Sequence, residues 1–284
     1  MSTTFTLCAQ CPDRPGIIAA VSGFIAGHGG SICEASQHLD PVSGWFFMRY
    51  EIRAETLALD LAAFRGEFQA VAGPLEMQWF VTASDQPKRV VILASRQDHC
   101  LADLLYRWRS GDMRFELPAV ISNHDDLRPL VEQHGVPFHH VPVRRAQCEA
   151  DFAHIRELYE ECRGDVMVLA RFMQVLPPAL CRDYAGCIIN IHHSFLPSFS
   201  GARPYAQAAE RGVKIIGATC HYVTEDLDAG PIIEQDVIRV HHGHTADQMA
   251  RQGRDVEKQV LARGLSYHLE DRVLLHGNRT IVFS

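Results

Sequence analysis

The sequence predicts an α/β protein with two domains, a ferredoxin-like βαββαβ domain followed by a mostly parallel, doubly wound domain. Three observations lead to this prediction. The chain has 284 residues, 47% of them hydrophobic, which is enough for two ordinary cores. The polar stretch "TASDQPKR" interrupts the apolar pattern. The order of strand-like and helix-like segments also differs on its two sides. We therefore expect domains at 1–84 and 89–284, joined by a linker at 85–88.

The segments before the linker fit the βαββαβ order. "FTLCAQ" reads as a strand, and apolar residues at helical spacing then predict a helix that begins near Ile17 and ends before Gly29. Two strands are expected at 31–39 and 45–53, joined by the turn-like "DPVSG". A second amphipathic helix is expected to bury Leu57, Leu61, Phe64, Phe68 and Val71. The segment "LEMQWFV" closes the domain as a strand, which completes a small antiparallel sheet with helices on one face.

After the linker, short apolar strands alternate with amphipathic helices. The expected strands are "VVILAS", "LPAVISN", "PFHHVPV", "DVMVLA" and "CIINIHH". Helices are expected around 101–110, 127–134 and 151–162. This alternation predicts a parallel sheet covered on both faces. Ligands of such sheets bind beyond the carboxyl ends of the strands, which is where a site should be sought.

Composition excludes several classes of partner. The net charge is −7 and no run of lysine or arginine occurs, so we expect no nucleic-acid partner and favour a small molecule. No apolar run reaches the ~18 residues of a membrane span, and the start "MSTTFTLCAQ" does not resemble a signal peptide. We therefore expect a cytoplasmic protein without a membrane partner. Its nine cysteines are expected to be reduced thiols.

Two groups of residues could bind a metal. Cys8 and Cys11 form a CxxC pair, but the chain has no second pair and Cys8 falls in a strand-like run. The run "HHGH", residues 241–244, lies in an expected loop with no acidic neighbour beyond Asp247. Both groups lack the ligand number and spacing of a metal site. We therefore expect no metal in this protein.

The stretch "NIHHSFLPSF" raises a catalytic alternative. Residues two apart in a strand face the same side, so Asn190 and His192 share one face while His193 faces the other. A histidine at a strand end can equally be structural, because imidazole readily bonds buried backbone groups. Three acids lie in the loop after the strand "IIGATCHYV": Glu225, Asp226 and Asp228. A histidine oriented by a carboxylate, beside an amide donor, suits acyl chemistry in which water or a substrate amine attacks.

These residues belong to a longer stretch, "INIHHSFLPSFSGARPYAQAAERGVKIIGATCHYVTEDLDAGPIIEQDVIRV", that resembles the catalytic core of the folate-dependent formyltransfer family. The resemblance implies a formyltransferase-like fold for residues 89–284 and a catalytic triad of Asn190, His192 and Asp228. "VLARFMQVL" resembles the folate-binding loop of that family. The resemblance further implies substrate-binding roles for Met173, Gln174, Val175, Leu176, His221, Thr224, Glu225 and Asp226.

The amino-terminal stretch "CPDRPGIIAAVSGFIAGHGGSI" resembles an ACT regulatory domain. The resemblance implies an amino-acid effector such as glycine or methionine. Its carboxylate would meet the start of the first helix, where backbone N–H groups are free, near Asp13, Arg14 and Gly16. The alternative is that this domain serves mainly to pair subunits through its sheet. In either case we expect a homo-oligomer.

An ACT domain ahead of this catalytic core is the layout of the hydrolytic branch of the family. The loop "ASRQDHCLADLL" lacks the glycines of a phosphate cradle, which disfavours a ribonucleotide acceptor. The resemblance therefore implies hydrolysis of 10-formyltetrahydrofolate to formate and tetrahydrofolate. This reaction balances one-carbon pools, supplies formate for purine biosynthesis and needs no cofactor besides the folate substrate. Two alternatives stay open: formyl transfer to a small amine, and a folate or amino-acid sensor without turnover.

Overall fold

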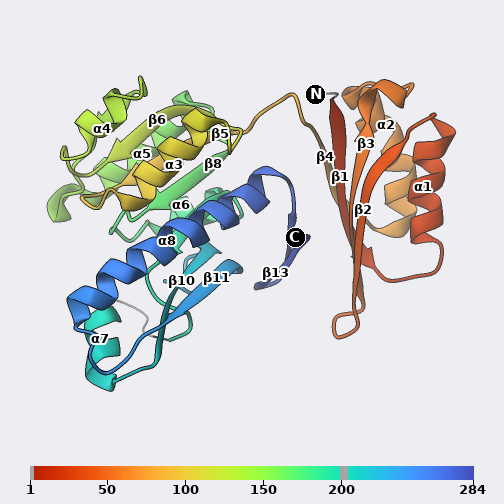
Figure 1. The fold of residues 1–284 in the computed structure, drawn as a ribbon. Coiled ribbons are helices and arrows are strands. Elements are labelled where there is room, and N and C mark those ends of the chain that lie inside the picture. The colour runs from red at the N-terminus through yellow and green to blue at the C-terminus, as the bar shows by residue number, and fades with distance from the viewer. Residues whose placement is uncertain (1–2, 199–203) are drawn as a thin grey trace. The chain divides into compact units, whose positions relative to one another are not determined.

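Figure 1 shows the chain as a computed structural model, in which residues 3–198 and 204–284 are described. The chain forms two compact units: the first runs to Pro87 and includes Asp271–Leu274 and Ile281–Ser284, and the second comprises Lys88–Glu270 and Leu275–Thr280. This division differs from a single cut at residues 85–88. Two short segments near the carboxyl end belong to the first unit because they pack against its sheet.

The first unit has the βαββαβ order. Its elements are β1 (Thr4–Pro12), α1 (Ile17–Gly27), β2 (Ile32–Asp40), β3 (Trp45–Arg53), η1 (Ala54–Thr56), α2 (Leu61–Ala72), η2 (Gly73–Leu75) and β4 (Gln78–Ala83). Among the described residues, the strands form one antiparallel sheet in the order β2-β3-β1-β4. The predicted fold class of this half is thereby confirmed, and the sheet is compatible with an ACT-like domain.

Both helices of the first unit lie on one face of its sheet (Figure 1). Ile17, Val21 and Ile25 of α1 are buried there together with Phe64 and Phe68 of α2. Leu57 lies outside α2, although its spacing fits the helical pattern. The helix begins later because the Asp60 side chain accepts a hydrogen bond from the Ala63 N–H and caps it at that point.

The second unit alternates strands and helices and ends in a hairpin. Its elements are β5 (Arg89–Ala94), α3 (His99–Ser110), β6 (Glu116–Ser122), α4 (Arg128–Glu132), β7 (Phe138–His140), η3 (Arg145–Gln147), α5 (Cys148–Glu161), β8 (Val166–Ala170), α6 (Pro178–Asp183), β9 (Ile188–His192), α7 (Pro204–Arg211), β10 (Ile215–Tyr222), β11 (Ile232–Arg239) and α8 (Ala246–Leu269). The hairpin strands β12 (Val273–His276) and β13 (Arg279–Val282) are shared between the two units.

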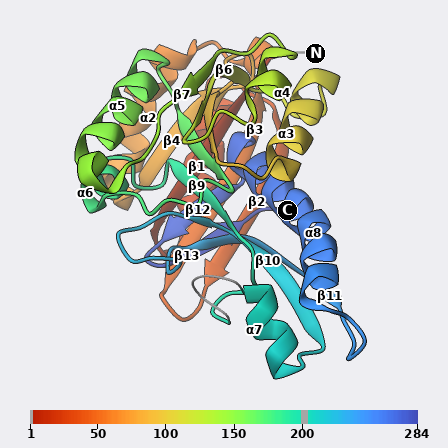
Figure 2. The same cartoon turned by 90° about the vertical axis from the view of Figure 1, so that its left-hand side faces the viewer.

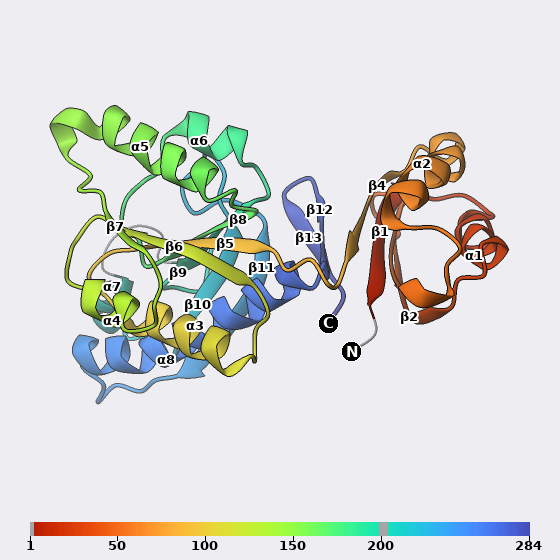
Figure 3. The same cartoon turned by 90° about the horizontal axis from the view of Figure 1, so that it is seen from above.

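A mostly parallel sheet forms the centre of the second unit. In the described part of the chain its order is β11-β10-β9-β8-β5-β6-β7. Strands β5 to β9 run parallel to their neighbours, whereas β10 is antiparallel to both β9 and β11. Helices α5 and α6 cover one face, and α3 and α8 the other (Figures 2 and 3). β8 is buried along its whole length, as expected of a parallel strand covered on both faces. The predicted fold class is confirmed for this half as well.

The run "HHGH" forms the loop before α8. His241 Nδ1 accepts a hydrogen bond from the Gly243 N–H, and His244 Nδ1 accepts one from the His241 N–H. A capping box of Thr245 and Gln248 then starts α8. The imidazoles therefore bond the loop's own backbone. No helix of the described residues is long and apolar enough to cross a membrane.

The second face of the first unit's sheet is covered by the ends of the carboxyl-terminal hairpin. Leu274 and Phe283 pack there with Cys8 and Phe47. Cys11 is instead buried in the core on the helix side of the same sheet. Because the two cysteines of the CxxC pair are buried in cores on opposite faces, they cannot bind one metal ion together.

Arg49 on β3 connects this face to the returning chain. Its side chain is almost fully buried, with 1% of the residue exposed. Its Nε donates to the Asp271 carbonyl at 3.1 Å, its Nη2 donates to Glu51, and its Nη1 lies 3.3 Å from Glu34 Oε1. A buried guanidinium is tolerated only when it is paired and hydrogen-bonded. Arg49 therefore fixes the position of the segment that begins at Asp271.

We expect Arg49→Ala to lower the free energy of unfolding by about 3 kcal/mol, because the Asp271 carbonyl and two carboxylates lose their donor. Urea denaturation followed by tryptophan fluorescence measures this loss. Arg53→Ala, which truncates an exposed arginine of the same strand, should change stability by less than about 0.5 kcal/mol. Equal denaturation midpoints for Arg49→Ala and the wild type would contradict the prediction.

Candidate active site

Strand β9 presents Asn190 and His192 at the centre of the second unit's sheet. Asn190 is half-buried and lies between the buried Ile189 and Ile191, and His192, which follows Ile191, is buried. β8 pairs with β9 in parallel, which brings Leu169 beside Asn190. On the other side, β10 runs antiparallel and pairs His221 with Asn190 and Thr219 with His192. Asn190 and His221 are therefore cross-strand neighbours.

The loop after β10 starts at the far end of β9 from His192. Tyr222 pairs with Ile189, and the Val223 N–H donates to the Ile188 carbonyl at 2.9 Å. The loop nevertheless brings Asp228 Oδ1 to 3.2 Å from His192 Nδ1. It must therefore turn back along β9. Asp228 has a left-handed backbone with a φ of 54°, which is uncommon outside glycine and costs about 1 kcal/mol or more.

The contact with Asp228 orients the His192 ring. Both side chains are buried, with 5% and 9% of their area exposed. An ionised carboxylate only accepts hydrogen bonds, so His192 Nδ1 carries the proton and the neutral ring keeps a lone pair on Nε2. Nε2 is buried and has no hydrogen-bond partner among the described residues. The ring thus offers one nitrogen for proton transfer while the other is held by Asp228.

His221 orients Asn190 in a similar way. Its Nδ1 lies 2.9 Å from the Tyr222 carbonyl, which only accepts, so Nδ1 carries the proton. Nε2 then accepts a hydrogen bond from Asn190 Nδ2 at 3.1 Å. Burial lowers the pKa of His221, which keeps the ring in this neutral form. The second N–H of the Asn190 amide remains available to a ligand.

A cavity of about 60 Å³ lies beside these groups. Most of the residues expected at the site line it: Gln174, Val175, Leu176, Asn190, His221, Thr224, Glu225, Asp226 and Asp228. Met173 is 57% exposed and is not part of the lining, and neither is His192, whose ring is held by Asp228. The sequence analysis missed the apolar part of the wall, formed by Leu169, Cys181, Val223 and Leu227. Such residues give no chemical signal in a sequence.

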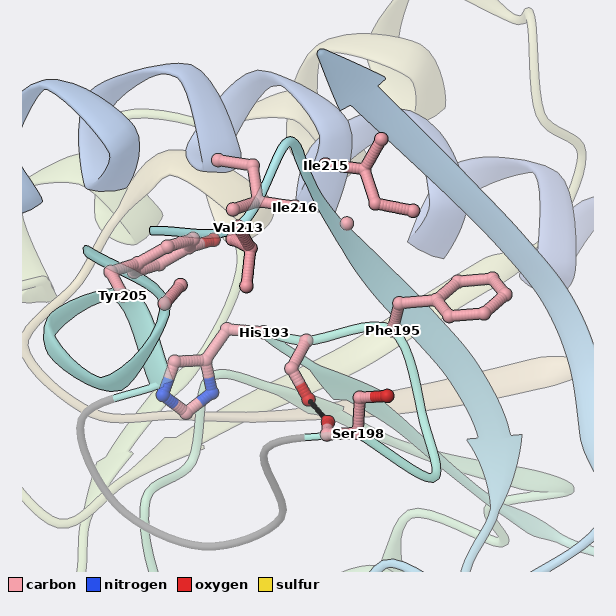
Figure 4. A pocket seen from close by; sticks show the side chains of 10 residues that line it. His193, Phe195, Ser198, Tyr205, Val213, Ile215 and Ile216 are labelled. Carbon is pink, nitrogen blue, oxygen red and sulfur yellow. Dashed lines mark hydrogen bonds between the residues drawn. The ribbon is translucent and has the colours of Figure 1, made fainter. Parts of the chain in front are cut away.

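His193 faces a second cavity of about 220 Å³, which is lined largely by apolar side chains (Figure 4). Tyr205 and Ile216 contribute to its wall. Burial, together with the nearby Arg171 charge, lowers the pKa of His193 to about 3. His193 is therefore a neutral ring that lines a cavity of its own, although it is adjacent to His192 in the chain.

A buried charged group lies near His193 and was not expected from the sequence. Glu257, 1% exposed, accepts hydrogen bonds from His99 Nε2 at 2.7 Å and from the Tyr205 hydroxyl at 2.6 Å, and lies 3.4 Å from Arg171 Nε. Burial alone would raise the pKa of Glu257, but the His99 hydrogen bond, the Arg171 charge and the Tyr205 hydrogen bond together lower it. His99, Cys100 and Glu257 are also the one group of possible metal ligands within 4.8 Å of one another in the described residues. A cation there would compete with Arg171 and His99 for the carboxylate.

The comparisons with known proteins identify the family. Residues 88–265 match the model of the Formyl transferase family. The formyltetrahydrofolate deformylase of Bacillus subtilis (strain 168) is 46% identical over 98% of this chain and 93% of its own length. The chain belongs to the formyltetrahydrofolate deformylase family. The crystal structure of a formyltetrahydrofolate deformylase from Pseudomonas syringae pv. tomato str. DC3000 is 60% identical, with a TM-score of 0.99 over 100% of this chain and 95% of that one.

A less similar solved structure matches only part of this chain. Glycinamide ribonucleotide transformylase 1 from Symbiobacterium toebii is 28% identical, with a TM-score of 0.66. The match covers 95% of that protein but only 70% of this chain. The deformylase family member is therefore longer than that transformylase, by roughly the size of the first unit.

The residues expected to meet an effector lie at the start of α1. Gly16 precedes the helix with a φ of 94°, and as a glycine in the N-cap position it has no side chain to cap the first turn. Arg14 forms an ion pair with Glu76 at 2.7 Å, and the Asp13 N–H donates to the Gly44 carbonyl. The free N–H groups of α1 fit a carboxylate, although Arg14 is already paired with Glu76. The effector site of this deformylase family member stays a prediction.

Two buried histidines should make this protein less stable in mild acid. Burial, with the Lys88 charge second, lowers the pKa of His268 to about 3, as happens at His193. In the unfolded chain both titrate near 6.5, so unfolding takes up protons below that pH and stability falls between pH 6.5 and 3. For one such histidine the loss at pH 5 is about 2 kcal/mol.

We therefore expect His268→Gln to lose about 2 kcal/mol less stability than the wild type between pH 7.5 and pH 5. Urea denaturation at the two pH values measures the difference. His154→Gln, at an exposed histidine of α5, serves as the control and should follow the wild type. An equal loss in all three proteins would show that His268 does not contribute to the pH dependence.

Proposed function

We propose that the protein hydrolyses 10-formyltetrahydrofolate to formate and tetrahydrofolate. The observation that carries this proposal is the buried contact between His192 Nδ1 and Asp228 Oδ1, with Asn190 in the same group and His192 Nε2 without a partner in the described residues. This arrangement can move a proton and stabilise an oxyanion without a nucleophilic side chain. Membership in the formyltetrahydrofolate deformylase family supports the same reaction.

In the proposed mechanism, a water molecule attacks the formyl carbon while Asp228 and His192 accept and pass on its proton. The formyl oxygen becomes negatively charged in the tetrahedral intermediate. The free N–H of Asn190 and the protonated Nε2 of His192 donate hydrogen bonds to it. The intermediate collapses when the bond between the formyl carbon and N10 breaks. N10 takes up the proton, and formate leaves with the oxygen of the water.

The substrate would bind across the cavity beside Asn190. The loop of Met173, Gln174, Val175 and Leu176 would meet the pterin ring through its backbone. On the opposite side, the loop from Thr224 to Asp228 would close over the folate and exclude water other than the nucleophile. The apolar wall that includes Leu169 and Val223 suits an aromatic ring system of this kind.

The reaction as proposed needs no metal and no cofactor besides the folate substrate, because Asp228, His192 and Asn190 supply the proton transfers and the hydrogen bonds. Formate released in this way would be available for purine biosynthesis, and tetrahydrofolate would return to the one-carbon pool. A cytoplasmic location fits nine cysteines that are all free thiols. The protein would act as a homo-oligomer.

The first unit would regulate the reaction by binding glycine or methionine. The start of α1 supports this because its N-cap residue, Gly16, has no side chain to occupy the N–H groups of the first turn. Asp13, Arg14 and Gly16 would surround the amino acid. The effector's amine could pair with Asp13, an exposed carboxylate. Arg14 would then have to leave Glu76 or bind the effector carboxylate together with it.

We expect Asp228→Asn to lower the rate of formate release by about 10³ or more, because the amide cannot take a proton or hold His192 in the same tautomer. Asn190→Ala should lower the rate of formate release by a factor of about 10² to 10³, the usual loss when one oxyanion donor is removed. Formate is followed with the folate substrate alone, and folate binding is measured separately. Binding should stay close to that of the wild type in Asp228→Asn.

The control is Asp255→Asn, which removes an exposed carboxylate of α8 and should leave the rate unchanged. Near-normal turnover by Asp228→Asn would refute the assigned proton carrier. Formate that appears only after an amine is added would favour a transferase. Folate binding without any formate would favour a sensor.

Isothermal titration with glycine and methionine tests the regulatory proposal. We expect one of them to bind, and Arg14→Ala to weaken that binding at least 10-fold through the loss of a charged partner. The catalytic variant Asp228→Asn should bind the effector as the wild type does. If neither amino acid binds, the first unit is left with the alternative role of pairing subunits.

A further inference from the structure

The tip of the carboxyl-terminal hairpin contacts the loop that contains Asp228. Its turn consists of Gly277, with a φ of 59°, and Asn278. Asn278 Nδ2 donates to the carbonyl of Ala229, the residue after Asp228, at 3.0 Å. The Thr280 hydroxyl donates to the Ile232 carbonyl, where β11 begins. The hairpin tip and this loop belong to the same unit.

The backbone around Asp228 needs support from outside the loop. Asp228 adopts a left-handed conformation that residues other than glycine take infrequently, although aspartate tolerates it better than most. The Ala229 N–H reaches the Asp226 carbonyl only at 3.4 Å, a long hydrogen bond. Gly230 packs so closely on the Tyr222 carbonyl that a Cβ would lie 1.9 Å from its oxygen. The loop is therefore strained at Asp228 and tightly packed two residues later.

We propose that Asn278 is a positioning residue for Asp228. Its amide fixes the carbonyl of Ala229, in the peptide between Ala229 and Gly230, and so restrains the backbone that directly follows the left-handed turn at Asp228. The Asp228 carboxylate then stays at 3.2 Å from His192 Nδ1. Asn278 itself touches neither the cavity nor the reacting atoms. The inference rests on the proposed function, because positioning matters only if Asp228 takes part in turnover.

The geometry separates this role from a general effect on folding. Asparagine and aspartate have nearly the same shape and both suit this turn position, so Asn278→Asp removes the donor without shortening the side chain. Asn278→Ala removes it without adding a charge or another donor. Thr280→Val removes the neighbouring hydrogen bond of the same hairpin, which ends on Ile232 rather than beside Asp228.

Steady-state kinetics with 10-formyltetrahydrofolate provide the first test. We expect kcat to fall about 10-fold in both Asn278 variants, with KM within about 2-fold of the wild type, because small displacements of a catalytic group reduce turnover more than binding. Thr280→Val should keep a kcat within about 2-fold of the wild type. Wild-type kcat in Asn278→Asp, or an equal loss in Thr280→Val, would overturn the proposal while the proposed function stands.

Hydrogen exchange of the peptide that covers residues 224–231 provides a second test that does not depend on turnover. We expect exchange in this peptide to be at least 5-fold faster in both Asn278 variants and nearly unchanged in Thr280→Val, because loss of the Ala229 anchor opens the loop locally. Unchanged exchange in the Asn278 variants would overturn the proposal. If the wild-type protein releases no formate at all, the proposed function fails. The comparison of exchange between the wild type and the Asn278 variants still shows whether Asn278 holds the loop.

Discussion

The contact between His192 Nδ1 and Asp228 Oδ1 determines what the rest of the site can do. An imidazole in water exchanges its proton freely between two nitrogens, but a carboxylate beside Nδ1 fixes the proton there. Nε2 is then the atom that can accept a proton and later donate it. Both groups are buried, so water does not screen the interaction. The proposed chemistry depends on the precision with which the fold holds these two side chains together.

The topology of the sheet explains why this contact needs an unusual loop. Because β10 is antiparallel to β9, the chain leaves β10 at the end of β9 that is farther from His192. A short loop can bring a carboxylate back only by turning sharply, and the left-handed backbone of Asp228 and the close packing of Gly230 belong to that turn. The same antiparallel register places His221 directly beside Asn190, where it orients the amide. One reversal of strand direction therefore leads both to the strain at Asp228 and to the ordered amide donor.

The sequence predicted the features that depend on local pattern. Strand alternation separated His192 from His193, and the order of the elements predicted both fold classes. Sequence patterns did not predict features that depend on contacts between residues far apart in the chain or on a single capping residue. Leu57 fits the helical spacing but lies before the cap formed by Asp60. Glu257 and His99 are 158 residues apart, and neither is part of a recognisable motif. The return of Asp271 to the buried Arg49 gives no signal in the sequence at all.

The two adjacent histidines show how burial and charge give the same side chain different properties. His192 lies against a carboxylate, whereas His193 lies near the Arg171 guanidinium, and burial together with that charge lowers the pKa of His193 to about 3. Glu257 holds Arg171 in place, so the positive charge near His193 is itself part of a buried network. A second protonated imidazole next to His192 would oppose the protonation that the proposed mechanism requires. Burial, with the Arg171 charge second, thus keeps His193 neutral, although the Glu257 carboxylate acts in the opposite direction. No positive charge on His193 then opposes the proton that the proposed mechanism places on His192.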